Sequence, residues 1–181
     1  MDKHLISTSK FLSLVLRHQP ELIGLNLDGQ GWASIETLLK TANAHGKKLD
    51  HDTLLRVVHE NEKQRFAISS DGLNIRANQG HSIDVELGLQ PVTPPTELYH
   101  GTVERFLESI RTQGLIKGTR QHVHLSADRR TAETVGSRRG KPIVLIVNAA
   151  AMSESGLQFY LSANGVWLTN HVPSPYLTFP Q

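Results

Sequence analysis

A cluster of prolines near the middle of the chain constrains the fold more than any other feature of the sequence. The stretch LQPVTPPTE, residues 89–97, holds three prolines within five positions. Each proline fixes its own φ angle and biases the preceding residue toward extended backbone, so neither a helix nor a central strand can run through this stretch. We therefore expect a linker that divides the 181 residues into two domains, residues 1–90 and 91–181.

Apolar residues recur at helical spacing through most of the first domain. The pattern predicts one helix over about residues 6–18, a second that Ser34 caps, and a third that Asp50 or Asp52 caps. Residues 65–77, RFAISSDGLNIRA, then alternate between apolar and polar side chains around an Asp-Gly turn, which predicts a β-hairpin. Three helices followed by a hairpin are typical of a winged-helix domain, a pattern that other small α+β domains share.

The second domain alternates between predicted strands and helices. The run PIVLIVNA is apolar throughout and predicts a buried central strand, and an Asn-Gly pair within LQFYLSANGVWLTN predicts a hairpin. Shorter segments predict a strand at ELYHG, a helix ending at Gly114, a strand at HVHLS, a helix capped by Asp128 and an edge strand at SPYLTF. The chain is therefore expected to be of the α+β class, with a mostly antiparallel, β-rich second domain.

Composition excludes several classes of function. The sequence has no cysteine, which excludes disulfides, thiolate metal sites and a cysteine nucleophile. No run approaches 18 consecutive apolar residues, so we expect no membrane span. Lys10 and Ser13 interrupt the apolar run at the N-terminus, and no small-residue cleavage site follows it, so we expect no signal peptide. A cytoplasmic protein is the expectation.

The net charge of +2 is unevenly distributed along the chain. Residues 1–90 hold ten Lys/Arg and eleven Asp/Glu, whereas residues 91–181 hold nine and six, with six arginines between Arg111 and Arg139. This imbalance is too small to indicate a nucleic-acid-binding protein by itself. It suits a site that binds a few phosphates through arginine forks, and it suits a solvated basic face equally well.

Three basic side chains alternate within the stretch TRQHVHLS, residues 119–126. In a strand, Arg120, His122 and His124 would point to one face of the sheet. Two histidines at this spacing could bind zinc, but no clustered pattern of Cys, His or Asp supplies a third ligand, so we expect no metal. Ordinary strand histidines are the simpler interpretation, and His122 and His124 are assigned no role.

Three further polar segments are candidates for a functional site. Arg17 and His18 end the first predicted helix, Arg65 precedes the hairpin, and HGT at residues 100–102 ends a predicted strand. Glycine lets the backbone approach a ligand closely, and threonine can cap a helix. Each segment also has an ordinary explanation, because cations complement a helix C-terminus, strand edges carry exposed cations, and turns contain glycine. His81 is expected on the solvated surface.

Taken together and in order, seven segments resemble the KptA-type RNA 2′-phosphotransferases across nearly the whole chain. They are FLSLVLRHQP, GW, KQRFAIS, LYHGT, RQHVHLS, VGSRRGKPIVL and NGVWLT. The resemblance implies a winged-helix lobe that binds the RNA phosphate and a lobe with the ADP-ribosyltransferase fold that binds NAD. It also implies the reaction, in which an internal 2′-phosphate of RNA is transferred to NAD through a 2′-phospho-ADP-ribosylated RNA. Nicotinamide and ADP-ribose 1″,2″-cyclic phosphate are released.

The resemblance also assigns roles to individual residues. The catalytic residues of the family match Arg17, His18, Arg65 and Arg120. Its NAD-contacting residues match His100, Gly101, Thr102, Leu125 and Ser126. The implied partners are RNA with a 2′-phosphate and NAD as a co-substrate, without a metal. We expect a monomer that does not associate with membranes.

Phosphate chemistry explains why these residue types are needed. The first nucleophile is a phosphate dianion, which requires positioning and charge neutralisation rather than a base, and Arg17, His18 and Arg65 can supply both. Arg120 is the candidate for stabilising the phosphoryl transfer of the second step, as positioned cations do in other phosphoryl transfers. A cleft between the two lobes would bring the RNA phosphate to NAD.

Two other functions remain open at this level. The same fold could add ADP-ribose to a terminal phosphate of RNA or DNA and stop after the first step. A winged-helix regulator without enzymatic activity is disfavoured. Its recognition helix would be DTLLRVVHENEK, which holds three acidic and only two basic residues, and the acidic residues would repel duplex phosphates.

Overall fold

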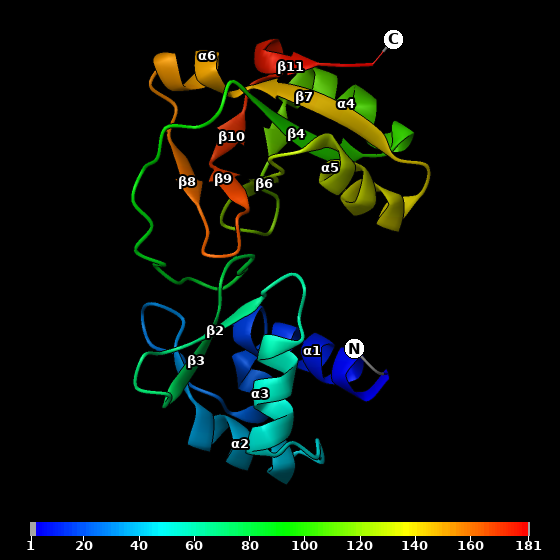
Figure 1. Cartoon of the computed structure of the whole chain (residues 1–181). Helices are drawn as coiled ribbons and strands as arrows, with labels where there is room; N and C mark the ends of the chain where they lie inside the picture. The colour runs from blue at the N-terminus through cyan, green and yellow to red at the C-terminus, as the bar shows by residue number, and fades with distance from the viewer. Residues whose placement is uncertain (1–2, 181) are drawn as a thin grey trace. The chain divides into compact units, whose positions relative to one another are not determined.

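The computed structural model describes residues 3–180 and divides the chain into two compact units, Met1–Gly88 (unit 1) and Leu89–Gln181 (unit 2; Figure 1). Within residues 3–180 there are six α-helices and several small sheets whose strands pair antiparallel. The expectation of a mixed fold with antiparallel sheets is therefore confirmed. The winged-helix and ADP-ribosyltransferase descriptions of the two halves stay predictions, as do the roles assigned to them.

Unit 1 consists of three α-helices, a short 3-10 helix and a sheet with the strand order β1-β3-β2. Its elements in chain order are α1 (Lys3–Arg17), η1 (Pro20–Ile23), β1 (Ala33–Ser34), α2 (Ile35–Ala44), α3 (His51–His59), β2 (Phe66–Ile68) and β3 (Asn74–Ala77). β2 and β3 form the expected hairpin. Leu73, an apolar residue of the predicted alternation, instead lies in the turn and is 65% exposed.

Two helices of unit 1 begin at the predicted capping residues. The Ser34 hydroxyl accepts a hydrogen bond from the backbone N–H of Thr37 at 3.3 Å, and the Asp50 carboxylate accepts one from that of Thr53 at 2.7 Å. Asp50, rather than Asp52, is therefore the cap of α3. The hydrogen bond from Thr53 lowers the pKa of the Asp50 carboxyl, so the cap stays charged and complements the positive end of the helix.

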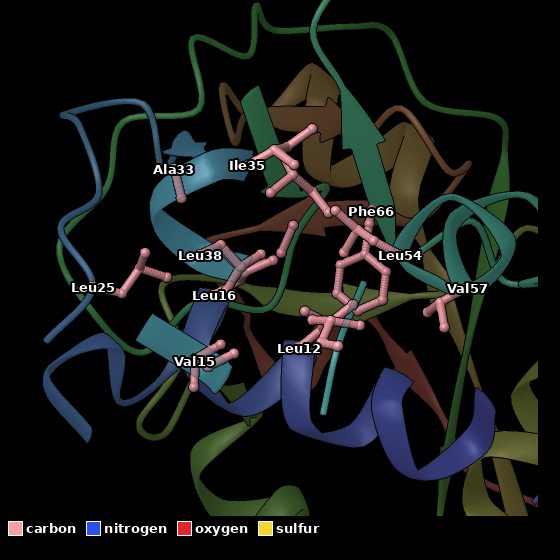
Figure 2. Packing of buried hydrophobic residues seen from close by; sticks show 14 of the residues in the cluster. Leu12, Val15, Leu16, Leu25, Ala33, Ile35, Leu38, Leu54, Val57 and Phe66 are labelled. Carbon is pink, nitrogen blue, oxygen red and sulfur yellow. The ribbon is translucent and has the colours of Figure 1, made fainter. Parts of the chain in front are cut away.

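One face of α1 is buried in the core of unit 1. Leu12, Val15 and Leu16 point into the same cluster as Leu38 of α2 and Phe66 of β2 (Figure 2), and each of these side chains is at most 3% exposed. Complete burial of a large apolar side chain contributes about 1.5–3 kcal/mol. This cluster therefore fixes the C-terminal end of α1, which carries Arg17.

Unit 2 contains three small sheets with the strand orders β11-β7-β4, β6-β9-β8 and β10-β5. Its elements in chain order are β4 (Glu97–Thr102), η2 (Glu104–Phe106), α4 (Leu107–Gln113), β5 (Leu115–Ile116), β6 (Val123–Leu125), α5 (Arg129–Gly136), η3 (Ser137–Arg139), β7 (Ile143–Asn148), α6 (Ala149–Glu154), β8 (Phe159–Leu161), β9 (Trp167–Thr169), β10 (His171–Val172), η4 (Ser174–Tyr176) and β11 (Leu177–Thr178). The apolar run PIVLIVNA forms the central strand β7, and SPYLTF supplies the edge strand β11, as predicted.

A close backbone contact joins β4 to α5, which lie side by side in Figure 1. A Cβ atom on Gly101 would overlap the carbonyl oxygen of Ala132 and would lie 2.8 Å from the backbone nitrogen of Gly136. Only glycine fits at this position, so the helix packs directly on the strand. α5 begins at the predicted cap, where Asp128 accepts a hydrogen bond from the N–H of Thr131 at 2.8 Å.

The stretch TRQHVHLS forms a shorter strand than the sequence predicted. β6 starts at Val123, and Arg120 and His122 precede it in a bend. Val123 and Leu125 are buried, so the strand alternation directs His124 to the opposite face. The expectation that all three basic residues share one strand face is therefore wrong.

None of the helices within residues 3–180 is long and apolar enough to cross a membrane.

Candidate functional site

The C-terminus of α1 places two predicted site residues next to a loop from far along the sequence. Arg17 is the last residue of α1, and His18 follows it and is exposed. The N–H of Ser82 donates to the Arg17 carbonyl oxygen at 2.9 Å, and the Ser82 hydroxyl lies 2.8 Å from Nδ1 of His18. Gly80 has a φ of 88°, and a Cβ atom there would lie 3.5 Å from Nη1 of Arg17. This loop therefore positions both side chains.

Arg65, the third predicted residue of unit 1, lies just before β2. Its Nη1 donates to the side-chain oxygen of Asn61 at 3.2 Å. Its carbonyl oxygen accepts hydrogen bonds from Nη2 of Arg17 at 3.4 Å and from the N–H of Asn78 at 2.9 Å. The Arg17 guanidinium also lies over the ring of Phe66, at 6.0 Å from its centroid. Arg17 and Arg65 are thus neighbours although 48 positions separate them.

His81, which was expected on the surface, is buried beside this group and is only 1% exposed. Burial lowers its pKa from the ordinary 6.5 to about 4, and the charges of Arg17, His18 and Arg76 contribute to the shift. The ring is therefore neutral near neutral pH. Neither of its nitrogens has a hydrogen-bond partner within residues 3–180. Because the His81 ring is neutral, it adds no further positive charge beside Arg17, His18 and Arg76.

The low pKa of His81 predicts that the protein loses stability in mild acid. Between about pH 6.5 and 4, the unfolded chain binds a proton at this residue that the folded chain does not bind. The free energy of unfolding therefore falls as the pH drops through this window, by a total on the order of 3 kcal/mol. Urea unfolding at a series of pH values measures this slope, and we expect His81→Gln to lose most of it.

His45→Gln is the matched control for this measurement, because His45 is an exposed histidine of the same unit. It should keep the slope of the wild-type protein. If His81→Gln also keeps that slope, then His81 takes up a proton as readily in the folded chain as in the unfolded chain, which contradicts the lowered pKa.

In unit 2, His100 and Arg120 both contact His124. The Nδ1–H of His100 donates to the carbonyl oxygen of His124 at 3.2 Å, which leaves Nε2 of a neutral His100 as an acceptor. Nη1 of Arg120 donates to Nδ1 of His124 at 3.1 Å. Because a guanidinium cannot accept a hydrogen bond, this contact requires a neutral His124 with its proton on Nε2. His124, which was assigned no role from sequence, therefore orients a predicted catalytic residue.

Several positively charged side chains lie near His100 and Arg120. Burial lowers the pKa of Arg120, and the charges of Arg139 and Arg138 lower it as well. Burial also lowers the pKa of His100, with Arg139 and Arg120 among the further causes. Cations that depress one another's pKa are stabilised when an anion binds between them. This part of unit 2 is therefore suited to an anionic ligand.

The remaining predicted residues lie on two neighbouring strands of unit 2. Gly101 and Thr102 end β4, whereas Leu125 ends β6 and Ser126 follows it. Ser126 and Tyr99 exchange backbone hydrogen bonds of 2.8 and 2.9 Å, which join the two strands. The Leu125 side chain is 2% exposed and belongs to the hydrophobic core, so the structure gives it a packing role. As ligand contacts, Leu125 and the other residues of this set stay predictions.

Sequence reasoning missed the residues that support the predicted ones. These are Ser82 beside His18, His81 near Arg17, and His124, which accepts a hydrogen bond from Arg120. No local pattern could have indicated Ser82, because its role depends on a contact over 64 positions of sequence. Among residues 3–180, no group of three or more His, Asp or Glu side chains is placed to hold a metal ion.

Comparison with known proteins identifies an enzyme family that this chain resembles over nearly its whole length. A family model described as "RNA 2'-phosphotransferase, Tpt1 / KptA family" matches residues 3–171. Probable RNA 2′-phosphotransferases from Rhodopirellula baltica and Hahella chejuensis are each 58% identical to this chain, over 180 and 178 residues. These alignments cover 99% and 98% of this chain and 98% and 96% of the relatives. A probable RNA 2′-phosphotransferase from Agrobacterium fabrum is 60% identical over 172 residues, which are 95% of this chain and 92% of the relative.

These matches span both units and define the protein as a transferase enzyme. The chain belongs to the RNA 2′-phosphotransferase family, Tpt1/KptA. The family resemblance predicted from the seven ordered segments is therefore confirmed.

Proposed function

We propose that this enzyme removes an internal 2′-phosphate from RNA by transferring it to NAD, and that Arg17, His18 and Arg65 bind that phosphate. The observation that carries the proposal is that Arg17 donates to the backbone of Arg65 while the loop around Ser82 contacts both Arg17 and His18, in a chain of the RNA 2′-phosphotransferase family. A phosphate dianion fits this group, because arginine forks match its oxygens and its charge offsets their mutual repulsion. The loop that contains Ser82 positions the group.

NAD is the proposed co-substrate of unit 2. The donor set fits a dinucleotide, because Arg138 and Arg139 suit its diphosphate, and the Nε2 acceptor of His100 suits a ribose hydroxyl. Bound NAD supplies a sugar carbon from which nicotinamide leaves as a neutral molecule. The residues proposed to line this site are His100, Gly101, Thr102, Leu125 and Ser126.

The proposed reaction has two steps. An oxygen of the 2′-phosphate attacks the sugar carbon, nicotinamide leaves with the electrons of the broken bond, and a 2′-phospho-ADP-ribosylated RNA forms. The adjacent ribose hydroxyl then attacks phosphorus, and the RNA 2′-oxygen leaves and takes up the proton that the hydroxyl loses. The products are RNA with a 2′-hydroxyl and ADP-ribose 1″,2″-cyclic phosphate.

Arg120 is assigned to the second step. Charge spreads over the non-bridging phosphate oxygens in that step, and a positioned guanidinium stabilises it. The hydrogen bond to His124 supports this assignment, because it orients the Arg120 guanidinium before the ligand binds. Pre-orientation reduces the ordering that must occur during the reaction.

The proposal also assigns a fold to each unit. The three helices and the hairpin of unit 1 are the elements that a winged-helix lobe requires. The small antiparallel sheets of unit 2, with α5 packed on β4, support an ADP-ribosyltransferase-like lobe.

A synthetic RNA with a single internal 2′-phosphate tests the proposed function. We expect the enzyme to remove this phosphate only when NAD is present and to release one nicotinamide for each phosphate removed. Mass spectrometry of the RNA and quantification of nicotinamide measure the two products. The same RNA without the 2′-phosphate is the control and should release no nicotinamide.

Absence of any NAD-dependent loss of the phosphate at high enzyme concentration would contradict the proposal. A second arm uses an oligonucleotide with a 5′-phosphate. If this oligonucleotide acquires a stable ADP-ribose while the internal 2′-phosphate stays intact, terminal-phosphate ADP-ribosylation is the function instead.

A further inference from the structure

Arg76 lies on the same face of the hairpin as Arg65. In the register of β2 and β3, Ala67 is opposite Arg76, and the pairing continues through the N–H of Asn78, which donates to the Arg65 carbonyl oxygen. Because side chains alternate along a strand, Arg65 and Arg76 are diagonal neighbours on the face turned away from the core. Such neighbours are about 7–8 Å apart, so two arginines in these positions can bind two adjacent anionic groups.

The Arg76 guanidinium is stacked on an aromatic ring. Its Cζ lies 4.5 Å from the ring centroid of Trp32, the residue just before β1. β1 pairs with β3 through Ala33 opposite Ile75, so the sheet fixes the backbone next to both partners. Stacking on a ring holds the plane of a guanidinium and leaves its N–H edge for a ligand.

Several polar atoms in this region are buried without a partner. They are the Nε of Arg76, the side-chain oxygen of Asn78 and both ring nitrogens of His81, which have no hydrogen-bond partner in the described part of the chain, residues 3–180. The charge of Arg76 also contributes to the low pKa of His81, as do those of Arg17 and His18, so these basic groups are close together. Buried polar groups are nearly always hydrogen-bonded, and the N–H donors of this cluster, on Nε of Arg76 and on one ring nitrogen of neutral His81, suit an anionic acceptor.

We propose that Arg76, held by Trp32, binds a second phosphate of the RNA, the 3′,5′-phosphodiester on the ribose that carries the 2′-phosphate. This inference rests on the proposed binding of the 2′-phosphate by Arg17, His18 and Arg65. The two phosphates are attached to adjacent carbons of one ribose, so the cations that bind them must be near neighbours, as Arg65 and Arg76 are. The contact gives the enzyme a preference for an internal 2′-phosphate over one on a 3′-terminal ribose, which has no such diester.

The test compares two short RNAs of the same sequence. One carries the 2′-phosphate internally, and the other carries it on the 3′-terminal nucleotide beside a 3′-hydroxyl. In Arg76→Gln, we expect the KM for the internal RNA to rise about tenfold with kcat nearly unchanged, and the KM for the terminal RNA to change less than about twofold. Because one phosphate contact is lost, the slope of log KM against log salt concentration should decrease by about 0.7 for the internal RNA alone.

Two further variants accompany this comparison. Arg56→Gln is the matched control, because Arg56 is an exposed arginine of α3, in the same unit, and lies 3.1 Å from Glu60. It should leave both KM values and both salt slopes unchanged. Arg76→Lys keeps the charge but loses the fork, so we expect a smaller rise of about threefold in KM, again for the internal RNA alone. Thermal unfolding establishes whether each variant is folded. If Arg76→Gln does not fold, the two RNAs are compared with Arg76→Lys instead.

Equal changes in KM for the two RNAs, or an unchanged salt slope, overturn the proposal and leave Arg76 as a packing partner of Trp32. Failure of the proposed function has a different signature. In that case neither the wild-type enzyme nor any Arg76 variant removes the 2′-phosphate from either RNA.

Discussion

An Arg120→Ala variant is expected to stop after the first step and to accumulate RNA that carries ADP-ribose on its 2′-phosphate. Without the guanidinium, the charge on the phosphoryl oxygens is not offset, and the second step should slow by about 10³–10⁵-fold, as when a positioned arginine is lost from other phosphoryl transfers. Release of nicotinamide should stay within about tenfold of the wild-type rate, since this step does not require Arg120 in the proposed mechanism. Mass spectrometry of the RNA and quantification of nicotinamide separate the two steps.

Two variants control for a general loss of charge or fold. Arg130→Ala removes an exposed arginine of α5 with no proposed role, and it should react like the wild-type enzyme. Arg120→Lys keeps a cation without the fork that reaches His124, so we expect an intermediate rate for the second step. If Arg120→Ala releases no nicotinamide at all, Arg120 acts in the first step and its assignment here is wrong.

Gly101→Ala is expected to destabilise unit 2 by about 3 kcal/mol or more, because a side chain at this position cannot coexist with α5. The new Cβ atom would overlap the Ala132 carbonyl oxygen and lie 2.7 Å from its carbon, and both are backbone atoms that move only if the helix moves. We expect the thermal midpoint to fall by more than about 10 °C. The fluorescence of Trp167, which lies in β9 of the same unit, can follow the unfolding.

Gly29→Ala is the control for this substitution, because a Cβ atom on Gly29 meets nothing within 4 Å and its φ is not in the left-handed region. Its midpoint should stay within a few degrees of the wild-type value. A Gly101→Ala variant as stable as the wild-type protein would show that α5 can shift away from β4 at little cost.

The fold was most predictable where short-range chemistry defines an element. Ser34, Asp50 and Asp128 cap their helices as expected, since an N-cap needs only a side-chain oxygen and an N–H three residues later. The run PIVLIVNA became the central strand because an apolar stretch of that length is stable only when both of its faces are covered. The two-residue strands β1, β5 and β10 were missed, because two residues show no periodicity.

The sequence proposed a set of site residues but could not give their arrangement. The ordered segments assign Arg17, His18, Arg65 and Arg120 through a family resemblance; the family itself is confirmed, and the roles of these residues stay predictions. The misassignment of His81 to the surface has a physical reason. A single histidine between polar neighbours gives no burial signal, and its environment is set by residues that approach it from other elements.

The sequence by itself therefore determined which residues can cap three of the helices, which run forms the central strand, and which enzyme family the chain belongs to, because these features are encoded in neighbouring residues or in ordered segments. Only the tertiary structure decided how the predicted side chains are held. Ser82 contacts His18 across 64 positions, and Arg76 of β3 stacks on Trp32, the residue just before β1. Contacts of this kind form only when the core brings distant segments together, so no local pattern encodes them.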